Sequence, residues 1–226
     1  MYGQMWMCHD SPDEMTSDSM RNLFVAKSQR TNCVHSTVLS RFAYTRFMSE
    51  TFAGELAVPV TEADHALGPS NAPVTLVEYG DYECPDCLNA FPIVQQLQER
   101  FGERLRFVFR HFPRNSIHPH AGVAAQAAEA AALQGKFWEM HETLFKNQHR
   151  LGDVDFGNLA LKVGAELYSF ESSITSDRVV RRVELDFNSG EQSNVRGTPT
   201  FFINGRKYVG KKDFESLSTT IEASMK

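Results

Sequence analysis

The chain has 226 residues, of which 42% are hydrophobic and 11% aromatic, so it holds enough apolar material for one full domain with an appendage. Its 23 basic and 28 acidic side chains give a net charge of -5, which argues against a nucleic-acid-binding surface. Four cysteines are too few for a disulfide framework in a chain of this length, so the core must hold without such links.

The first part of the chain, residues 1–68, is rich in Met, Ser, Thr, Asp and Arg and shows no sustained helical or strand periodicity. We interpret it as an accessory extension with weak structure of its own. A dense cluster of turn-forming residues at 68–73 marks the start of a compact domain, which we expect to cover 69–226.

Targeting signals are not evident in the sequence. The start of the chain lacks the basic residues and the uninterrupted apolar stretch of a secretory signal, and no segment is long enough to span a bilayer. The sequence therefore favours a cytoplasmic protein with no membrane insertion. A periplasmic location is the alternative if the start or leader is misassigned.

The compact domain begins with an alternation of strand and helix. The run Val74–Tyr79 is short, β-branched and almost continuously apolar, which predicts a strand covered on both faces. A helix is predicted over Pro85–Phe101, followed by Gly102, which can adopt the left-handed conformation that ends a helix. Alternating apolar residues over Leu105–Phe112 predict a second strand, parallel to the first in a βαβ unit.

A helical insertion is predicted at about 114–190. It contains an Ala-rich run, Ala121–Leu133, and an amphipathic stretch, Phe137–Phe145, whose aromatic residues have the spacing of a buried helix face. Further helices are expected near 155–164 and 176–188.

A hairpin and a helix close the predicted domain. The stretches Thr200–Ile203 and Arg206–Val209 flank the pair Asn204-Gly205, which tolerates the positive φ angles of a two-residue hairpin turn. Asp213 is placed to cap a last helix with one apolar face. The elements together predict an α/β fold with a mixed central sheet.

Two cysteines three positions apart lie where the first strand ends and the first helix begins. Cys84 is near the helix N-cap, where free backbone N–H groups and the helix dipole favour a thiolate and can lower a thiol pKa from about 8.5 to roughly 3.5–7.5. Cys87, one turn inside, would resolve a mixed disulfide. Pro85 fits the first helical turn and stiffens it. The carboxylate of Asp86 is expected to raise the pKa of the nucleophile and make the disulfide less oxidising.

The CPDC motif, the helical insertion and the segment GTPTFFING resemble the DsbA-like branch of the thioredoxin superfamily over residues 69–226. The resemblance implies a thioredoxin fold with a helical insertion between its βαβ and ββα halves. It also implies a thiol-disulfide oxidoreductase that exchanges disulfides with cysteine-containing proteins. A redox partner protein or glutathione would exchange electrons with this oxidoreductase, which would need neither a cofactor nor a metal.

The resemblance also assigns roles to residues outside the cysteine pair. Glu78, six residues before Cys84, takes the place of a buried acid that serves proton transfer, and Pro92 that of a proline that kinks the first helix. Thr198 and Pro199 correspond to a cis-proline element opposite the disulfide. A substrate groove is expected from Pro85, Asp86, Thr198 and Pro199. The Pro-Asp dipeptide differs from the Pro-His of strongly oxidising members, so the direction of electron flow stays open.

Two other functions remain open. The domain could be a non-catalytic metal-binding or docking module, as related domains occur attached to transporters, or a glutathione-dependent isomerase or transferase-like enzyme. Zinc usually takes about four ligands, and no second pair lies on neighbouring elements, which favours the redox interpretation of the cysteines. Glu78 could also be a satisfied buried acid.

Other histidines and cysteines are interpreted as structural or incidental. Cys8, His9, Cys33 and His35 could form a metal site with two cysteine and two histidine ligands in the extension, but they lack the usual spacing of such a site, so we do not expect metal binding there. Surface or loop positions, not catalysis, are expected for His111, His118 and His120.

Overall fold

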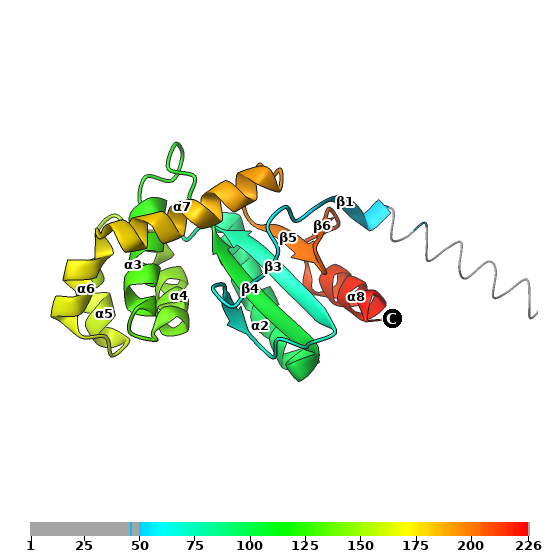
Figure 1. Cartoon of the computed structure of the whole chain (residues 1–226), viewed down its shortest axis with the longest axis horizontal. Helices are drawn as coiled ribbons and strands as arrows, with labels where there is room; N and C mark the ends of the chain where they lie inside the picture. The colour runs from blue at the N-terminus through cyan, green and yellow to red at the C-terminus, as the bar shows by residue number, and fades with distance from the viewer. Residues whose placement is uncertain (1–45, 47–49, 226) are drawn as a thin grey trace, which may run out of the picture. The chain divides into compact units, whose positions relative to one another are not determined.

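A computed structural model describes residues 46 and 50–225 of the chain (Figure 1). Its strands are β1 (Phe52–Glu55), β2 (His65–Leu67), β3 (Val74–Gly80), β4 (Leu105–His111), β5 (Thr200–Ile203) and β6 (Arg206–Tyr208). Its α-helices are α2 (Pro85–Phe101), α3 (Ala121–Ala132), α4 (Phe137–Lys146), α5 (Phe156–Lys162), α6 (Leu167–Ile174), α7 (Asp177–Gln192) and α8 (Phe214–Ser224). Two short 3-10 helices, η1 (Gly102–Arg104) and η2 (Gln148–Arg150), follow α2 and α4.

The strands form one mixed sheet in the order β1-β6-β5-β3-β4-β2. β3 and β4 are parallel, with Val74 opposite Leu105 and Gly80 opposite His111, and the other pairs are antiparallel. The predicted βαβ unit, insertion and closing hairpin are therefore confirmed. At the hairpin turn Asn204 and Gly205 have φ angles of 48° and 78°, as the sequence predicted.

β3 and β4 are covered on both faces, which explains their nearly continuous apolar sequence. Alternate residues of β3, Val77 and Tyr79, join a buried cluster that α7 covers with Phe187. The intervening residues point to the opposite face, where Glu78 shares a small cavity with Val94 of α2. α2 and α8 pack against each other, and Figure 1 shows α7 crossing the sheet from the insertion.

The insertion is built around the Ala-rich helix α3, which packs against α4, α5, α6 and α7. Most of its alanines are fully buried, because small side chains let neighbouring helices approach closely. The sequence predicted α3, α4, α5 and α7 within a few residues. It did not predict α6, which begins after Glu166, whose carboxylate accepts hydrogen bonds from the N–H groups of Tyr168 and Ser169.

The described part of the predicted extension contributes to the sheet. The boundary was expected at residue 69, yet β1 and β2 form the two edges of the sheet. Buried Arg110 of β4 explains part of this arrangement. Its guanidinium donates two hydrogen bonds to Asp64, at 2.7 and 3.1 Å, and others to the carbonyls of Val58 and Pro59. This segment therefore depends on contacts distant in sequence.

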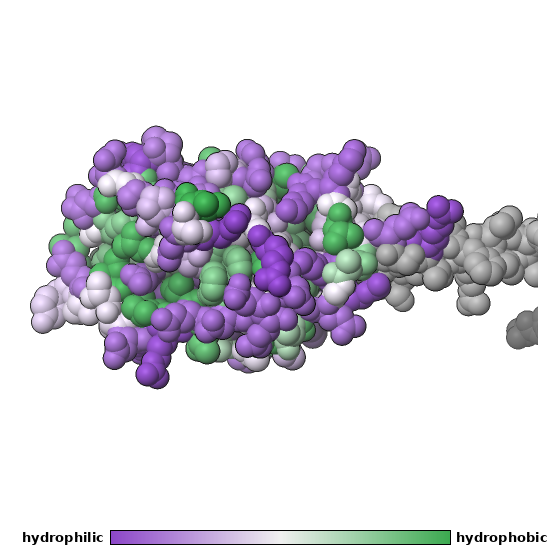
Figure 2. Space-filling model, turned by 90° about the horizontal axis from the view of Figure 1, so that it is seen from above, coloured by the Kyte–Doolittle hydropathy of each residue, from purple (hydrophilic) through white to green (hydrophobic). Residues whose placement is uncertain are grey.

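On the face shown in Figure 2, apolar residues are interspersed with polar ones and are most frequent over the end that the insertion forms. Leu161 and Tyr168, which are 52% and 78% exposed, belong to that end. None of the helices in the described residues combines the length and apolar character needed to cross a membrane.

Candidate active site

Cys84 occupies the N-cap of α2, with an extended backbone (φ -76°, ψ 121°), and Pro85 opens the helix. Proline fits this place because its missing N–H would have no partner in the first turn, and its fixed φ suits a helix. The backbone N–H groups of Asp86 and Cys87, in the first turn of this helix, help to stabilise the Cys84 thiolate.

The cis-proline element lies directly against this sulfur. The Thr198–Pro199 peptide bond is cis and immediately precedes β5. The Cys84 sulfur lies 3.3 Å from the Thr198 carbonyl oxygen, which accepts a hydrogen bond from it when Cys84 is protonated. The Thr198 hydroxyl is buried and, among the described residues, has no hydrogen-bond partner. Cys84 thus meets the predicted Thr198–Pro199 element in space although 114 positions separate Cys84 from Thr198.

The two cysteines are free thiols with opposite pKa shifts. The pKa of Cys84 falls from 9.0 to about 5, because the Cys87 thiol hydrogen-bonds to it, with help from the backbone N–H groups of Cys87 and Asp86. Burial raises the pKa of Cys87 well above its ordinary value. At neutral pH one sulfur is a thiolate and its neighbour a thiol.

Glu78 lies on the same face of the sheet as α2 and is only 3% exposed. Its pKa is raised to about 8, first by burial and then by the negative charge of Cys84, while Lys212 acts in the opposite sense. Glu78 lines a small cavity of about 120 Å³ that Gln98 and Glu142 also line. A buried acid with room for water beside it can hold and release a proton near pH 8.

Asp86 acts on the Cys84 sulfur in two opposite ways. Its carboxylate, which we expect to raise the pKa of Cys84, is exposed, whereas its backbone N–H helps to lower that pKa. Exposure to solvent weakens the carboxylate because water screens it. The N–H groups at the start of the helix therefore outweigh the carboxylate of Asp86, and the net pKa of Cys84 is lowered.

The structure also brings together residues that the sequence analysis did not single out. Gln148 of η2 donates hydrogen bonds to the carbonyls of Tyr82 and Cys84, both at 2.9 Å. Lys212 donates to the carbonyl of Pro199 at 2.6 Å. Both residues lie far from the CPDC motif in sequence, so no local pattern marked Gln148 or Lys212 as part of the site.

Asp81 holds the turn that precedes Cys84. Its carboxylate accepts hydrogen bonds from the backbone N–H groups of Glu83 and Arg114 and lies 2.7 Å from Nδ1 of His118. An aspartate just before a helix start is a common turn signal, so the sequence could have suggested this role.

The histidine predictions are partly wrong. His111 ends β4 and is 1% exposed, with its ring hydrogen-bonded to Glu129, so it is neither a surface nor a loop residue. His118 and His120 lie between β4 and α3, as expected, and are partly exposed. The candidate site with Cys8 and Cys33 lies outside the described residues.

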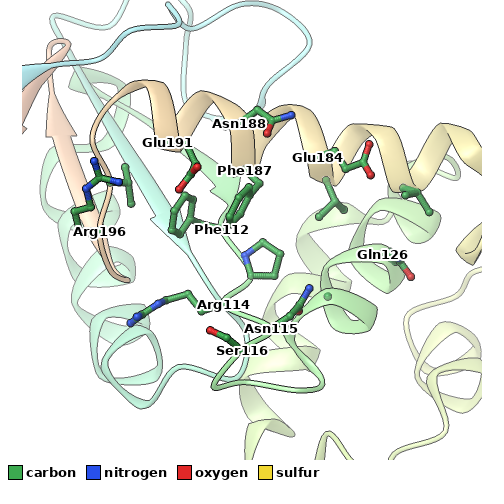
Figure 3. Close-up of a pocket in the computed structure, with 15 residues that line it drawn as sticks. Phe112, Arg114, Asn115, Ser116, Gln126, Glu184, Phe187, Asn188, Glu191 and Arg196 are labelled. Atoms are coloured by element: carbon green, nitrogen blue, oxygen red, sulfur yellow. The ribbon is translucent and has the colours of Figure 1, made fainter.

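A second cavity, of about 600 Å³, lies between the segment after β4, α3 and α7 (Figure 3). Phe112 and Phe187 stack in it with ring centroids 4.6 Å apart. Arg114 and Arg196 lie on the same side of this cavity, and Arg196 is two residues before Thr198. The cavity therefore adjoins the cis-proline segment.

Metal ligands are not gathered around the two sulfurs. Within residues 46 and 50–225, no His, Asp or Glu forms a three-ligand group with Cys84 and Cys87.

A protein-family model described as thioredoxin matches residues 60–223. Among curated proteins, the Na(+)/H(+) antiporter NhaA 1 of Salinispora arenicola is 43% identical over 171 residues. The alignment covers 75% of this chain and 26% of that protein, so the chain spans about a quarter of the length of the curated relatives it matches.

Solved structures show the same fold. Oxidised BdbD from Bacillus subtilis matches with a TM-score of 0.67 and 26% identity, over 77% of this chain and 98% of that one. The alpha-DsbA1 protein of Wolbachia pipientis matches with a TM-score of 0.62 and 18% identity, over 75% and 94% of the two chains. At 18% identity this second match concerns the fold alone.

Proposed function

Because the chain belongs to the thioredoxin family, as a DsbA-like member, we propose that it is a thiol-disulfide oxidoreductase acting through Cys84 and Cys87. The observation that carries the proposal is the Cys84 sulfur at the helix N-terminus, 3.3 Å from the carbonyl oxygen of Thr198 beside the cis-proline. This arrangement puts an ionised sulfur next to a backbone segment with which a substrate could pair.

The proposed exchange transfers two electrons without a cofactor. In the oxidising direction a substrate thiolate attacks the Cys84 sulfur of the Cys84–Cys87 disulfide, forming a mixed disulfide and releasing Cys87 as a thiolate. A second substrate thiolate then attacks the substrate sulfur of the mixed disulfide and releases Cys84. The substrate leaves with a disulfide, and the protein holds both cysteines reduced.

Glu78 is proposed as the proton shuttle for the buried cysteine. Cys87 has a raised pKa, so it takes up a proton as soon as it is released. With a pKa of about 8, Glu78 is mostly protonated at neutral pH and can supply that proton, which the adjoining small cavity then replaces from water. In the reducing direction the carboxylate of Glu78 would remove the proton from the Cys87 thiol.

The low pKa of Cys84 favours oxidation of substrates. A stabilised thiolate stabilises the reduced protein, and a couple whose reduced form is stabilised has a disulfide that is a stronger oxidant. We therefore propose net oxidation of cysteine-containing proteins, followed by reoxidation by a partner protein or glutathione. This direction suits the periplasm, the alternative location, better than a reducing cytoplasm.

The substrate is proposed to lie along the cis-proline segment. An extended chain could pair with the backbone at Thr198, next to the Cys84 sulfur, with Pro85 and Asp86 on its other side. This arrangement favours polypeptide substrates over a small glutathione conjugate, since backbone pairing needs an extended chain.

The test uses two cysteine variants. Cys84→Ser should abolish insulin reduction and refolding of a scrambled substrate, whereas Cys87→Ser should lose turnover yet accumulate a mixed disulfide that reducing agents release. Retained turnover in Cys84→Ser would reject the function. Stoichiometric zinc or copper held by both sulfurs, without turnover, would support a metal-binding module instead.

A further inference from the structure

Three potential metal ligands from three different elements converge in a group that includes neither Cys84 nor Cys87. His65 begins β2, His111 ends β4, and Glu129 lies in α3. Nε2 of His65 is 2.8 Å from Oε1 of Glu129, and Nε2 of His111 is 3.0 Å from the same oxygen. All three ligand atoms lie within 4.8 Å of one another.

We propose that His65, His111 and Glu129 form a binding site for a zinc-type divalent cation. Two imidazole nitrogens and a carboxylate oxygen are a ligand set that zinc takes in proteins, with a water molecule as the fourth ligand. With bonds of about 2.0–2.2 Å, ligand atoms in a tetrahedron lie about 3.3 Å apart. The separations of 2.8 and 3.0 Å need to open by only a few tenths of an ångström.

The orientation of the ligands is already fixed by packing. The His65 ring stacks on Phe137, with centroids 3.5 Å apart and an angle of 8° between the planes. His111 is 1% exposed and is held at the end of β4. On binding, each imidazole presents its Nε2 lone pair to the ion and carries its single proton on Nδ1. A site whose rings need not be ordered on binding loses less conformational entropy.

A cavity of about 430 Å³ reaches this site, because His65 and Glu129 both line it. It provides a route for the ion and space for the water ligand. Arg182 is the nearest cation, with Nε 3.9 Å from Oε1 of Glu129. Asp186 forms an ion pair with Arg182, so the two charges offset each other and leave the Glu129 carboxylate to balance part of the ion's charge. The other arginines in the cavity wall, Arg178 and Arg181, are exposed to water.

The ion would join the edge strand β2 to the sheet and to the insertion. β2 has three residues and pairs only with β4 among the described strands. A metal linking His65 to Glu129 would therefore stabilise the edge of the domain. The site lies apart from the proposed redox chemistry, so its failure would leave the redox proposal standing.

The experiment measures zinc binding in a full-length background without cysteines, made by replacing Cys8, Cys33, Cys84 and Cys87 with Ser. This background removes every thiolate ligand. After incubation with zinc chloride and gel filtration, metal analysis should find one zinc per chain. Cobalt should give the visible absorption of a tetrahedral nitrogen and oxygen site. Zinc should also raise the melting temperature of this background protein.

The key comparison is between His65→Asn and His149→Asn in that background. His65 lies at the start of an edge strand and His149 is an exposed histidine of η2, so the second variant is a matched control. His65→Asn should lose the bound zinc and the thermal shift, and His149→Asn should keep both. The proposal is overturned if the background protein binds no zinc or shows no thermal shift, or if His65→Asn binds it as well as the control.

Discussion

Replacing Glu78 with Gln tests whether this acid holds a proton inside the fold. Glu78 is 3% exposed, and its pKa is about 8 instead of the ordinary 4.5, because burial disfavours the carboxylate. The folded protein binds this proton more tightly than the unfolded chain. Its stabilising effect is therefore complete below about pH 4.5 and is lost as the pH rises to about 8. At about 1.4 kcal/mol for each pH unit, the loss reaches roughly 4–5 kcal/mol.

The assay is urea denaturation of both reduced proteins at about pH 5, 7 and 9. Since the thiols titrate in both, the difference in the free energy of unfolding between wild type and Glu78→Gln reports mainly on Glu78. This difference should shift in favour of Gln by several kcal/mol over the range. Glu142→Gln, across the small cavity, should follow the wild type. Parallel curves for wild type and Glu78→Gln would refute the buried-acid argument. The variant should also slow the resolving step about 100-fold.

When the ionisation of Cys84 is monitored by thiolate absorbance, its midpoint should lie near pH 5. The reduced protein should also lose the stability that the Cys84 thiolate contributes as the pH falls through 5. A midpoint near 9.0 would contradict the stabilisation of this thiolate at the helix N-terminus. Gln148→Leu leaves two carbonyls of the active-site turn without their donor and should cost about 1–3 kcal/mol in denaturation experiments. Arg110→Leu leaves the buried carboxylate of Asp64 without its cation and should lower the free energy of unfolding by about 3–5 kcal/mol. Unchanged stability would show that this ion pair does not stabilise the fold. Asp86→Asn should lower the pKa of Cys84 and raise the reduction potential, by about 10–30 mV against glutathione, whereas an unchanged potential would show that the carboxylate is fully screened.

The elements that the sequence predicted well are those with strong local signals. β3 and β4 are apolar on both faces, α2 is bounded by Pro85 and Gly102, and the hairpin turn has the pair Asn204-Gly205. β1 and β2 have four and three residues and no alternation. Their positions depend on partners far along the chain, so no local pattern could reveal them.

The site shows the same division between local and distant information. Cys84 and Glu78 could be located because a motif and a fixed offset mark them. Gln148 and Lys212 could not, since only the folded chain brings Gln148 to the turn at Cys84 and Lys212 to the carbonyl of Pro199. For Asp86, the sequence does not reveal that its side chain is exposed while its backbone N–H helps to lower the pKa of Cys84.

The buried guanidinium of Arg110 has a practical consequence for anyone producing this domain in isolation. A fragment that begins at Pro69 would lack Asp64 and the carbonyls of Val58 and Pro59, leaving a cation in the interior with most of its acceptors removed. The same cut would strip β2 from β4 and uncover a strand able to pair with other molecules. Recombinant fragments starting after residue 68 should precipitate, whereas those starting at or before residue 50 should remain monodisperse.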